Sequence, residues 1–340
     1  MSSDMLVHVL EAPGEVSERR QAVPQLAPGH CLIEVKYLGL CGTDLAFFDG
    51  TSNYIRDGAK AYPFVFGHEW SGQVVSTAGD VTSLMPGARV AGHNFRPCGS
   101  CERCAAEQWL YCPRRSEIGV LGAMPGAAST FLLAPANTLT AIPDTLGDAE
   151  AALLEPCSAA VHAIQRATVS SNDRVAVVGA GTLGLTVLQL AVALGARVCV
   201  VEPSAVLRQL ALELGAHEAV PPASAPLHAF SVVIEASGSA AGTRQAAWLC
   251  GPGARLAQVG TPHAPVDGYP VSELVINNVS VHAVLSGVNS WQELLRNVVS
   301  GHVCLQPLIH EIFPRARMKD AFNALATPGR ARPKILIQMS

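Results

Sequence analysis

The sequence predicts an α/β protein in which a β-rich part precedes a doubly wound parallel sheet. In the first third, short apolar segments are separated by Gly and Pro, and segment 31–40, CLIEVKYLGL, alternates as antiparallel strands do. From residue 173 onward, apolar strands alternate with helical segments, as in DRVAVVGAGTLGLTVLQLAVALGARVCVVEP. Such alternation is typical of a parallel sheet covered by helices.

Composition narrows the function classes. The chain has 340 residues, a length that favours about two domains. It is 49% hydrophobic and only 15% charged, and its net charge of −4 comes without a basic run, so we expect no nucleic-acid partner. The N-terminus lacks a signal-peptide pattern and the apolar stretches are too short for a bilayer. We therefore expect a cytoplasmic protein with no membrane partner.

Four cysteines lie close together in RPCGSCERCAAEQWLYCP, as Cys98, Cys101, Cys104 and Cys112. Disulfides are rare in a reducing cytosol, where clustered cysteines more often bind metal. The spacing C-x2-C-x2-C-x7-C lets the thiolates converge on one tetrahedral ion, although a similar run can hold an iron–sulfur cluster. Because four thiolates leave no position for a substrate, we predict a structural metal site that braces a loop.

A glycine turn predicts dinucleotide binding. Gly179, Gly181 and Gly184 fit G-x-G-x-x-G, with Thr182 and Leu183 between the last two. The motif alone is weak, and a Gly-rich turn of another α/β fold is the alternative. Here it follows the strand RVAVV and opens a helix, the context in which backbone N–H groups approach a pyrophosphate.

The next predicted strand favours NAD as the dinucleotide. Glu202 ends that strand, 18 residues beyond Gly184. A carboxylate there accepts hydrogen bonds from the ribose hydroxyls and repels a 2′-phosphate, so NAD is favoured over NADP. Arg208 follows closely and softens that preference.

Three further residues suggest a catalytic metal site. Cys41 lies in GLCGTDLAFF, His68 in FGHEWSG and Glu155 in LLEPCSAA. Taken singly, a cysteine or a histidine is most often a structural residue of the core. Burying a carboxylate in an apolar stretch, in contrast, costs free energy unless the carboxylate is paired or binds a metal. Together they supply three protein ligands to zinc and leave a fourth position for water or substrate.

With these motifs in view, the chain resembles the zinc-dependent medium-chain dehydrogenases/reductases, the alcohol and polyol dehydrogenase family. The resemblance extends over essentially the whole chain and rests on motifs in the family's order: CGTD at 41–44, GHE at 67–69, the four cysteines, EP at 155–156 and the glycine fingerprint. It implies a GroES-like β-barrel catalytic domain and a Rossmann NAD-binding domain, with the active site in the cleft between them.

The resemblance also implies domain limits. We expect the catalytic domain to comprise residues 1–152 and 290–340, with the structural zinc lobe at 95–115, and the Rossmann domain to comprise 153–289. Two zinc ions per subunit and NAD are the implied cofactors. Relatives are homodimers or homotetramers, and segment 278–287 is our candidate for pairing across a two-fold axis.

Roles for single residues follow from the same resemblance. Cys41, His68 and Glu155 match the catalytic zinc ligands, and Glu69 matches an acidic neighbour that approaches the metal. Thr43 matches the hydroxyl that starts the proton relay. Two nearby residues have lesser parts: Asp44 matches a partner that orients the histidine, and Cys157 is a core thiol and a minor candidate ligand.

The implied reaction interconverts a secondary alcohol and its ketone by hydride transfer to nicotinamide. A polyol, sugar or cyclitol is the substrate class we expect, and Tyr54, Arg56 and Lys60 are either pocket residues or members of a solvated loop. Alternatives are a threonine-type or simple secondary-alcohol dehydrogenase, a zinc-free reductase, and a non-catalytic NAD-binding protein. The zinc-free reductase would lack the three ligands, and the binding protein would have no need of them.

Overall fold

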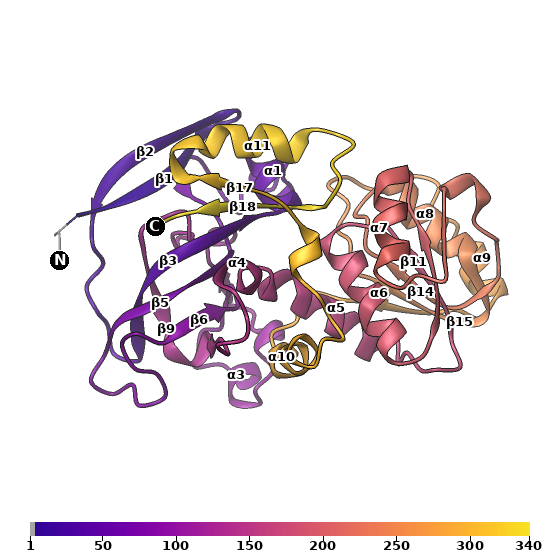
Figure 1. Cartoon of the computed structure of the whole chain (residues 1–340), viewed down its shortest axis with the longest axis horizontal. Coiled ribbons are helices and arrows are strands. Elements are labelled where there is room, and N and C mark those ends of the chain that lie inside the picture. Colours follow the sequence, from indigo (N-terminus) through magenta and orange to yellow (C-terminus); the bar gives the residue numbers. More distant parts are fainter. Residues whose placement is uncertain (1–3) are drawn as a thin grey trace. The chain divides into compact units, whose positions relative to one another are not determined.

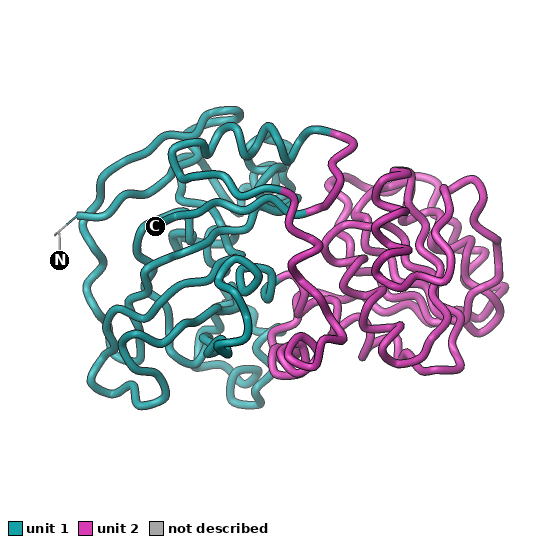
Figure 2. The backbone as a smooth tube through the Cα atoms, viewed as in Figure 1, with its two compact units in different colours: residues 1–155, 311–327, 334–340 teal, residues 156–310, 328–333 magenta. Residues whose placement is uncertain are grey.

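The structure is a computed structural model that describes residues 4–340. The described chain divides into two compact units (Figure 2), the first made of residues 4–155, 311–327 and 334–340 and the second of 156–310 and 328–333. The chain therefore returns to the first unit at Glu311. The sequence analysis predicts that the catalytic domain resumes earlier, at residue 290. In the part of the chain described here, no helix combines the length and the apolar character needed to span a membrane.

The first unit is built mainly of strands (Figure 1). Its elements are β1 (Asp4–Ala12), β2 (Glu15–Ala22), β3 (His30–Leu40), α1 (Gly42–Phe48), α2 (Asn53–Arg56), β4 (Phe64–Val65), β5 (Glu69–Thr77), β6 (Arg89–Gly92), β7 (Phe95–Arg96), α3 (Glu102–Ala105), β8 (Ser116–Glu117), β9 (Phe131–Pro135), β10 (Leu139–Ala141), α4 (Asp148–Ala151), α11 (Met318–Ala326) and β18 (Lys334–Gln338). Two elements, α5 (Leu154–Arg166) and β17 (Ile309–Pro314), continue across the boundary between the units.

A seven-stranded sheet organises this unit, in the order β10-β6-β5-β3-β18-β17, with β9 also paired to β3. A three-stranded sheet, β2-β1-β4, and the two-stranded ribbon β7-β8 complete it. The strand predicted at 31–40 is confirmed as β3, and its Ile33 and Val35 are buried in the core with Trp70 and Phe66. The last strand, β18, pairs antiparallel with β3, so segments about 300 residues apart in the sequence are neighbours in one sheet.

The second unit carries the predicted doubly wound fold. Its elements are β11 (Arg174–Val178), α6 (Thr182–Ala193), β12 (Arg197–Val201), α7 (Ala205–Glu213), β13 (Glu218–Val220), β14 (Phe230–Glu235), α8 (Ala240–Leu249), β15 (Cys250–Gln258), α9 (Val271–Ile276), β16 (Ser280–Ala283) and α10 (Trp291–Val299). All neighbours in the sheet β13-β12-β11-β14-β15-β16 are parallel. β11, β12 and β14 are buried almost throughout, as their unbroken apolar runs predict.

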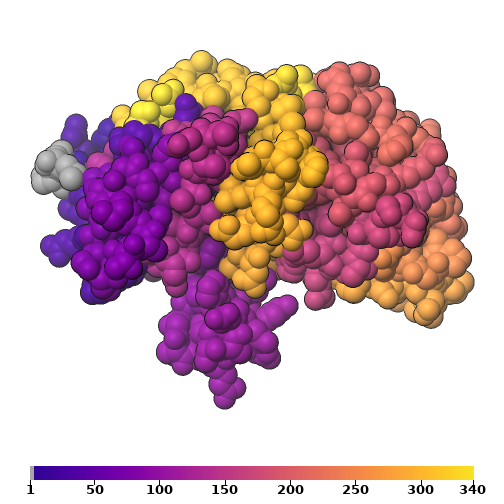
Figure 3. All heavy atoms as spheres, turned by 60° about the horizontal axis from the view of Figure 1, so that its bottom comes forward, coloured from indigo at the N-terminus to yellow at the C-terminus, as the bar shows by residue number. Residues whose placement is uncertain are grey.

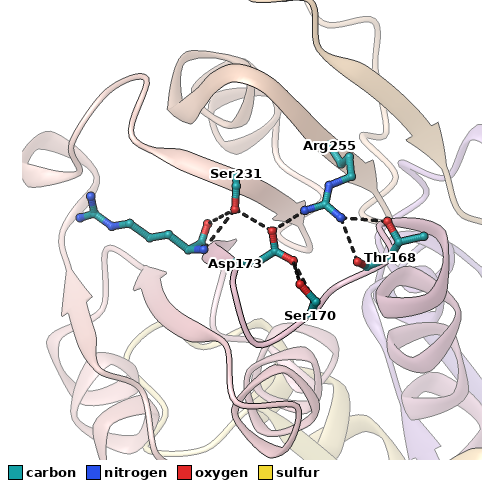
Figure 4. Close-up of polar contacts among 6 residues, drawn as sticks. Thr168, Ser170, Asp173, Ser231 and Arg255 are labelled. Atoms are coloured by element: carbon teal, nitrogen blue, oxygen red, sulfur yellow. Dashed lines mark hydrogen bonds and ion pairs between the residues drawn. The ribbon is translucent and has the colours of Figure 1, made fainter.

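A polar network joins the start of β11 and β14 to β15 in this sheet (Figure 4). Asp173, just before β11, accepts hydrogen bonds from Ser170 N at 2.8 Å and from Ser231 Oγ of β14 at 2.8 Å, and it pairs with Arg255 of β15. Arg255 Nη1 also donates to Thr168 O at 2.8 Å. Burial acts to raise the pKa of Asp173, but these hydrogen bonds and Arg255 outweigh it, and the pKa lies below its usual value.

We therefore expect Asp173→Asn to lower the free energy of unfolding by about 2–4 kcal/mol, because it leaves Arg255 without its counter-charge. A depressed carboxyl pKa contributes stability that is complete above about pH 4 and is lost as the pH falls through the folded-state value. The difference from wild type in urea unfolding should therefore shrink between pH 6 and pH 3. The exposed ion pair between Arg197 and Glu218 offers a control, since Glu218→Gln should lower the free energy of unfolding by less than about 1 kcal/mol. Equal effects of the two variants would contradict the prediction.

Candidate active site and metal centres

The first candidate metal site lies at one end of the seven-stranded sheet. β3 ends at Leu40, β5 begins at Glu69, and the antiparallel pairing places Gly39 opposite Glu69. Cys41 follows β3 and His68 precedes β5, so the pairing brings both to the same edge. Cys41 Sγ lies 3.3 Å from His68 Nε2. Sulfur and nitrogen ligands of one tetrahedral zinc lie about 3.5 Å apart, so this spacing fits the metal.

Two overlapping groups of ligand atoms share His68. Those of Cys41, Asp44 and His68 lie within 4.8 Å of one another, as do those of His68, Glu69 and Glu155. All except Cys41 are buried. His68 therefore lies with Cys41 in one group and with Glu155 in the other, and no group among the described residues contains all three predicted ligands. Thiol, imidazole and carboxylate are donors that suit zinc.

Short-range contacts hold the cysteine and the histidine in place. Cys41 caps α1: its Sγ accepts from Thr43 N at 3.3 Å, and Asp44 Oδ2 accepts from Cys41 N at 3.0 Å. The other oxygen, Asp44 Oδ1, lies 3.6 Å from His68 Nδ1. The pKa of His68 lies well above its usual value, because the charges of Cys41 and Asp44 outweigh burial. This geometry leaves Nε2 facing the thiol, the orientation of a histidine ligand supported by a carboxylate.

Glu69 makes a contact that the sequence analysis did not anticipate. Its Oε2 pairs with Lys334 Nζ, and both side chains are almost fully buried. Lys334 is the first residue of β18 and also donates to Leu40 O at 3.1 Å. A Cβ at Gly39 would lie 2.6 Å from Glu69 Oε2, so this pair needs glycine at that position of β3. Glu69 thus lies beside the candidate ligands with its charge already balanced.

Glu155 is the second residue of α5 and lies among charges of both signs. Burial raises its pKa to about 7; His68 and Lys334 act to lower it, whereas Glu69 and Glu117 act to raise it. A carboxyl with this pKa is easily ionised by a cation placed next to it. The neighbouring Cys157 has its Sγ 3.2 Å from Thr186 Oγ1, which agrees with a core thiol.

The four clustered cysteines form the second candidate metal site. Sγ of Cys101 lies 3.5 Å from that of Cys104 and 3.9 Å from that of Cys112, and the sulfurs of Cys98 and Cys104 are 3.9 Å apart. Sulfurs around a tetrahedral zinc are about 3.8 Å apart, so the four thiols fit one ion. The segment that carries them projects from the surface of the first unit (Figure 3). No disulfide joins any cysteine of the described chain.

The glycine motif forms the expected turn in the second unit. Gly179 has φ of +96°, and a Cβ there would meet the backbone of Ser237 at 2.9 Å. A Cβ at Gly184 would lie 1.9 Å from Gly179 O, so helix α6 packs directly on the turn. At Gly181 a Cβ would meet nothing within 4 Å, which leaves space beside the backbone where a phosphate approaches. Thr182 and Leu183 form the first turn of α6.

Glu202 follows β12 and is tied to this turn. Its Oε2 accepts from Ala180 N at 2.8 Å, and its Oε1 accepts from Ser204 N at 2.9 Å. Arg208 Nη1 donates to the carbonyls of Glu202 and Pro203 at 2.8 and 2.7 Å. The carboxylate thus lies next to the glycine turn, where the sequence analysis expected it, and it also stabilises that turn.

The three candidate pocket residues of segment 51–61 differ in their surroundings. Arg56 is exposed and pairs with Asp57. Lys60 is buried, and its Nζ donates to Gly122 O at 2.7 Å. Tyr54 is half-buried, and its pKa is raised by burial and by Glu117, with His68 acting against the rise.

Comparison with known proteins agrees with this geometry. Residues 27–144 match the family described as the alcohol dehydrogenase GroES-like domain, and residues 182–300 match the zinc-binding dehydrogenase family. Sorbitol dehydrogenase of Bombyx mori is 30% identical over 348 residues, covering 97% of each chain. The chain belongs to the zinc-type medium-chain alcohol and polyol dehydrogenase family. The expected GroES-like and Rossmann domains are therefore confirmed.

Solved structures place this medium-chain dehydrogenase among similar folds. Galactitol-1-phosphate dehydrogenase of Escherichia coli aligns with a TM-score of 0.85 at 25% identity, covering 98% of this chain and 100% of that one. A structure described as a zinc-binding dehydrogenase from Sinorhizobium meliloti 1021, bound to NADP, aligns with a TM-score of 0.89 at 26% identity, covering 99% and 100%. The family thus supports a zinc-binding enzyme with a nicotinamide cofactor.

Proposed function

We propose that this medium-chain dehydrogenase uses zinc and NAD(H) to interconvert a secondary alcohol of the polyol, sugar or cyclitol type and its ketone. The observation that carries the proposal is that His68 shares one group of close ligand atoms with Cys41 and a second with Glu155. A non-catalytic NAD-binding protein would have no use for three ligands of a zinc site that is open to substrate. The four-cysteine lobe would hold a second, structural zinc, which gives two ions per subunit.

When bound, zinc supplies Lewis acidity at the alcohol oxygen, and nicotinamide accepts the hydride. Cys41, His68 and Glu155 would hold the metal, while Asp44 keeps the imidazole oriented from its Nδ1 side. Thr43 lies on the first turn of α1, and its backbone N–H donates to Cys41 Sγ. Its hydroxyl is the group we assign to receive the proton of the substrate alcohol.

The function test is NADH formation by the purified, zinc-loaded enzyme with a panel of secondary alcohols. The panel contains polyols, polyol phosphates, cyclitols, aminocyclitols, threonine and simple alkanols. We expect turnover of at least one polyol, sugar or cyclitol, and preference for threonine or an alkanol would favour the corresponding alternative. Binding of NAD with no turnover of any member would contradict the proposal.

Glu202 is the residue we assign to the choice of NAD over NADP. Glu202→Ala should lower the ratio of NADPH to NADH dissociation constants by about tenfold, because the carboxylate that repels a 2′-phosphate is gone. NADH binding should also weaken, since Ala180 N loses its acceptor. The matched control is Glu213→Ala, an exposed residue on α7 whose carboxylate contacts Gln209. An unchanged ratio in fluorescence titrations would move the discrimination to other residues.

We also propose that the enzyme is a homodimer or homotetramer. β16 is an edge strand of the sheet in the second unit and lies inside the predicted segment 278–287. Val275, Ile276 and Val281 are 73%, 76% and 48% exposed, an apolar area that a second copy would cover. Light scattering of the zinc-loaded protein gives the number of subunits, and a monomer would refute the assignment.

A further inference from the structure

A buried carboxylate outside the proposed machinery lies on the ribbon β7-β8. Glu117 is only 3% exposed, and in the ribbon it stands opposite Phe95. The residue after it, Ile118, donates from its N–H to Asn94 O at 2.9 Å and so fixes the ribbon at this end. A buried acid needs partners that balance its charge.

Backbone packing places Glu117 next to the candidate metal site. A Cβ at Gly119 would lie 2.6 Å from Gly67 O and 2.8 Å from Gly67 N, so these two backbone segments touch. Gly67 directly precedes His68, and Glu117 lies two residues from the contact. The pKa values of Tyr54 and Glu155, which burial raises, are raised further by Glu117. Glu117 therefore lies within electrostatic reach of the site's own residues.

The carboxylate of Glu117 retains capacity to accept hydrogen bonds. Within residues 4–340, its one hydrogen-bond donor is Arg115, whose Nε reaches Oε1 at 3.3 Å. Arg115 is partly exposed and also lies over the Phe95 ring at 5.5 Å. A carboxylate offers about four acceptor positions, and a single long contact occupies one of them. Donors on a ligand suit the others.

The neighbouring cations are poorly placed to receive a phosphorylated ligand. Lys60 is held by Gly122 O, and Arg56 is exposed beside Asp57. Arg96 is buried, and in the ribbon it pairs with Ser116, the residue before Glu117. Neighbouring positions of a strand face opposite sides, so Arg96 and Glu117 lie on opposite faces of the ribbon. Arg115 is partly exposed, but it is already paired with Glu117. What this end of the ribbon offers a ligand is therefore the remaining acceptor positions of the Glu117 carboxylate.

We propose that Glu117 determines the substrate class: its carboxylate receives the ammonium group of a secondary alcohol that also carries an amine. This inference rests on the proposed dehydrogenase function and narrows its substrate to amino alcohols of the cyclitol or polyol type. The charged hydrogen bond would be made in a site shielded from water, where such bonds are strong.

The test compares three matched substrates at pH 7: an inosamine, the inositol of the same ring stereochemistry, and the monophosphate of that inositol. For the zinc-loaded wild type, kcat/KM should be at least about tenfold higher for the inosamine than for either of the others. Isothermal titration of the inosamine into the enzyme should show the same order of affinity. Turnover that favours the inositol or its phosphate would overturn the inference while leaving the dehydrogenase function in place.

Two variants separate recognition from folding. Glu117→Gln keeps the shape and removes the charge, so kcat/KM for the inosamine should fall about 10- to 100-fold while that for the inositol changes less than about threefold. The matched control is Glu34→Gln, which breaks the ion pair of Glu34 with Lys36, two residues along β3. It should change kcat/KM for neither substrate. Equal loss on both substrates, with zinc content and melting temperature unchanged, would assign Glu117 a general role and refute the inference. Absence of NADH formation with every secondary alcohol tested would instead refute the proposed function.

Discussion

Cys41→Ser should lower kcat/KM by at least about a thousandfold and remove one of two zinc ions from each subunit, with the fold intact. The thiol lies 3.3 Å from His68 Nε2, and a serine hydroxyl is a poor zinc ligand at neutral pH. Folding should survive because the hydroxyl can still accept from Thr43 N at the start of α1. Zinc analysis, NADH formation and circular dichroism measure the three expectations separately.

The matched control for this variant is Cys157→Ser. Cys157 follows Glu155 by two residues, but its thiol contacts Thr186 Oγ1 in the other compact unit's core. We expect it to retain both zinc ions and most activity. A Cys41→Ser protein that keeps two zinc ions, or one that unfolds globally, would contradict the assignment of Cys41 as a ligand of a purely catalytic metal.

Cys101→Ser should have the largest effect on stability. Cys101 Sγ lies within 4 Å of the sulfurs of both Cys104 and Cys112, so losing it breaks the set of four thiolates. Structural zinc contributes folding free energy directly, and we expect a loss of several kcal/mol in the lobe, with a fall in Tm of roughly 5–10 °C. The exposed lobe should also become sensitive to protease, since its helix α3 has only four residues.

Cys304→Ser is the control for this second variant, because Cys304 is exposed and lies outside both clusters. It should retain two zinc ions and the wild-type Tm. A Cys101→Ser protein with normal stability and full zinc content would refute the structural site, and an iron content in place of zinc would favour the iron–sulfur alternative. Loss of zinc alone, without loss of activity, would show that the lobe acts far from the reaction.

Local patterns made most of the fold predictable. The alternation in β3 and the buried runs of β11 and β12 mark strands because their periodicity reflects which faces are covered. The segment 146–167 forms two helices, α4 and α5, with Gly147 as the cap of the first. α10 belongs to the second unit because Ser290 and Glu293 hydrogen-bond Gln165. Such contacts join residues more than 120 positions apart, and no local pattern reveals them.

The candidate site was predictable where short motifs mark it and not where distant pairing builds it. Cys41 and His68 stand in recognisable motifs, whereas Lys334 reaches Glu69 only because β18 pairs with β3. A lysine directly before the apolar run ILI at 335–337 was a signal, since a charge at the start of a buried strand needs a partner. Glu117 gave no such signal, because its burial comes from the pairing of β7 with β8.

The pairing of Lys334 with Glu69 also orders events during synthesis. A nascent chain that ends before residue 334 has already made Cys41, His68 and Glu155, yet it lacks the cation that balances Glu69 and the strand that completes the sheet beside β3. Burying Glu69 at that stage would leave a charge without a partner, at a cost of several kcal/mol. The candidate centre, whose proposed ligands lie within residues 41–155, therefore matures only after the ribosome has translated β18.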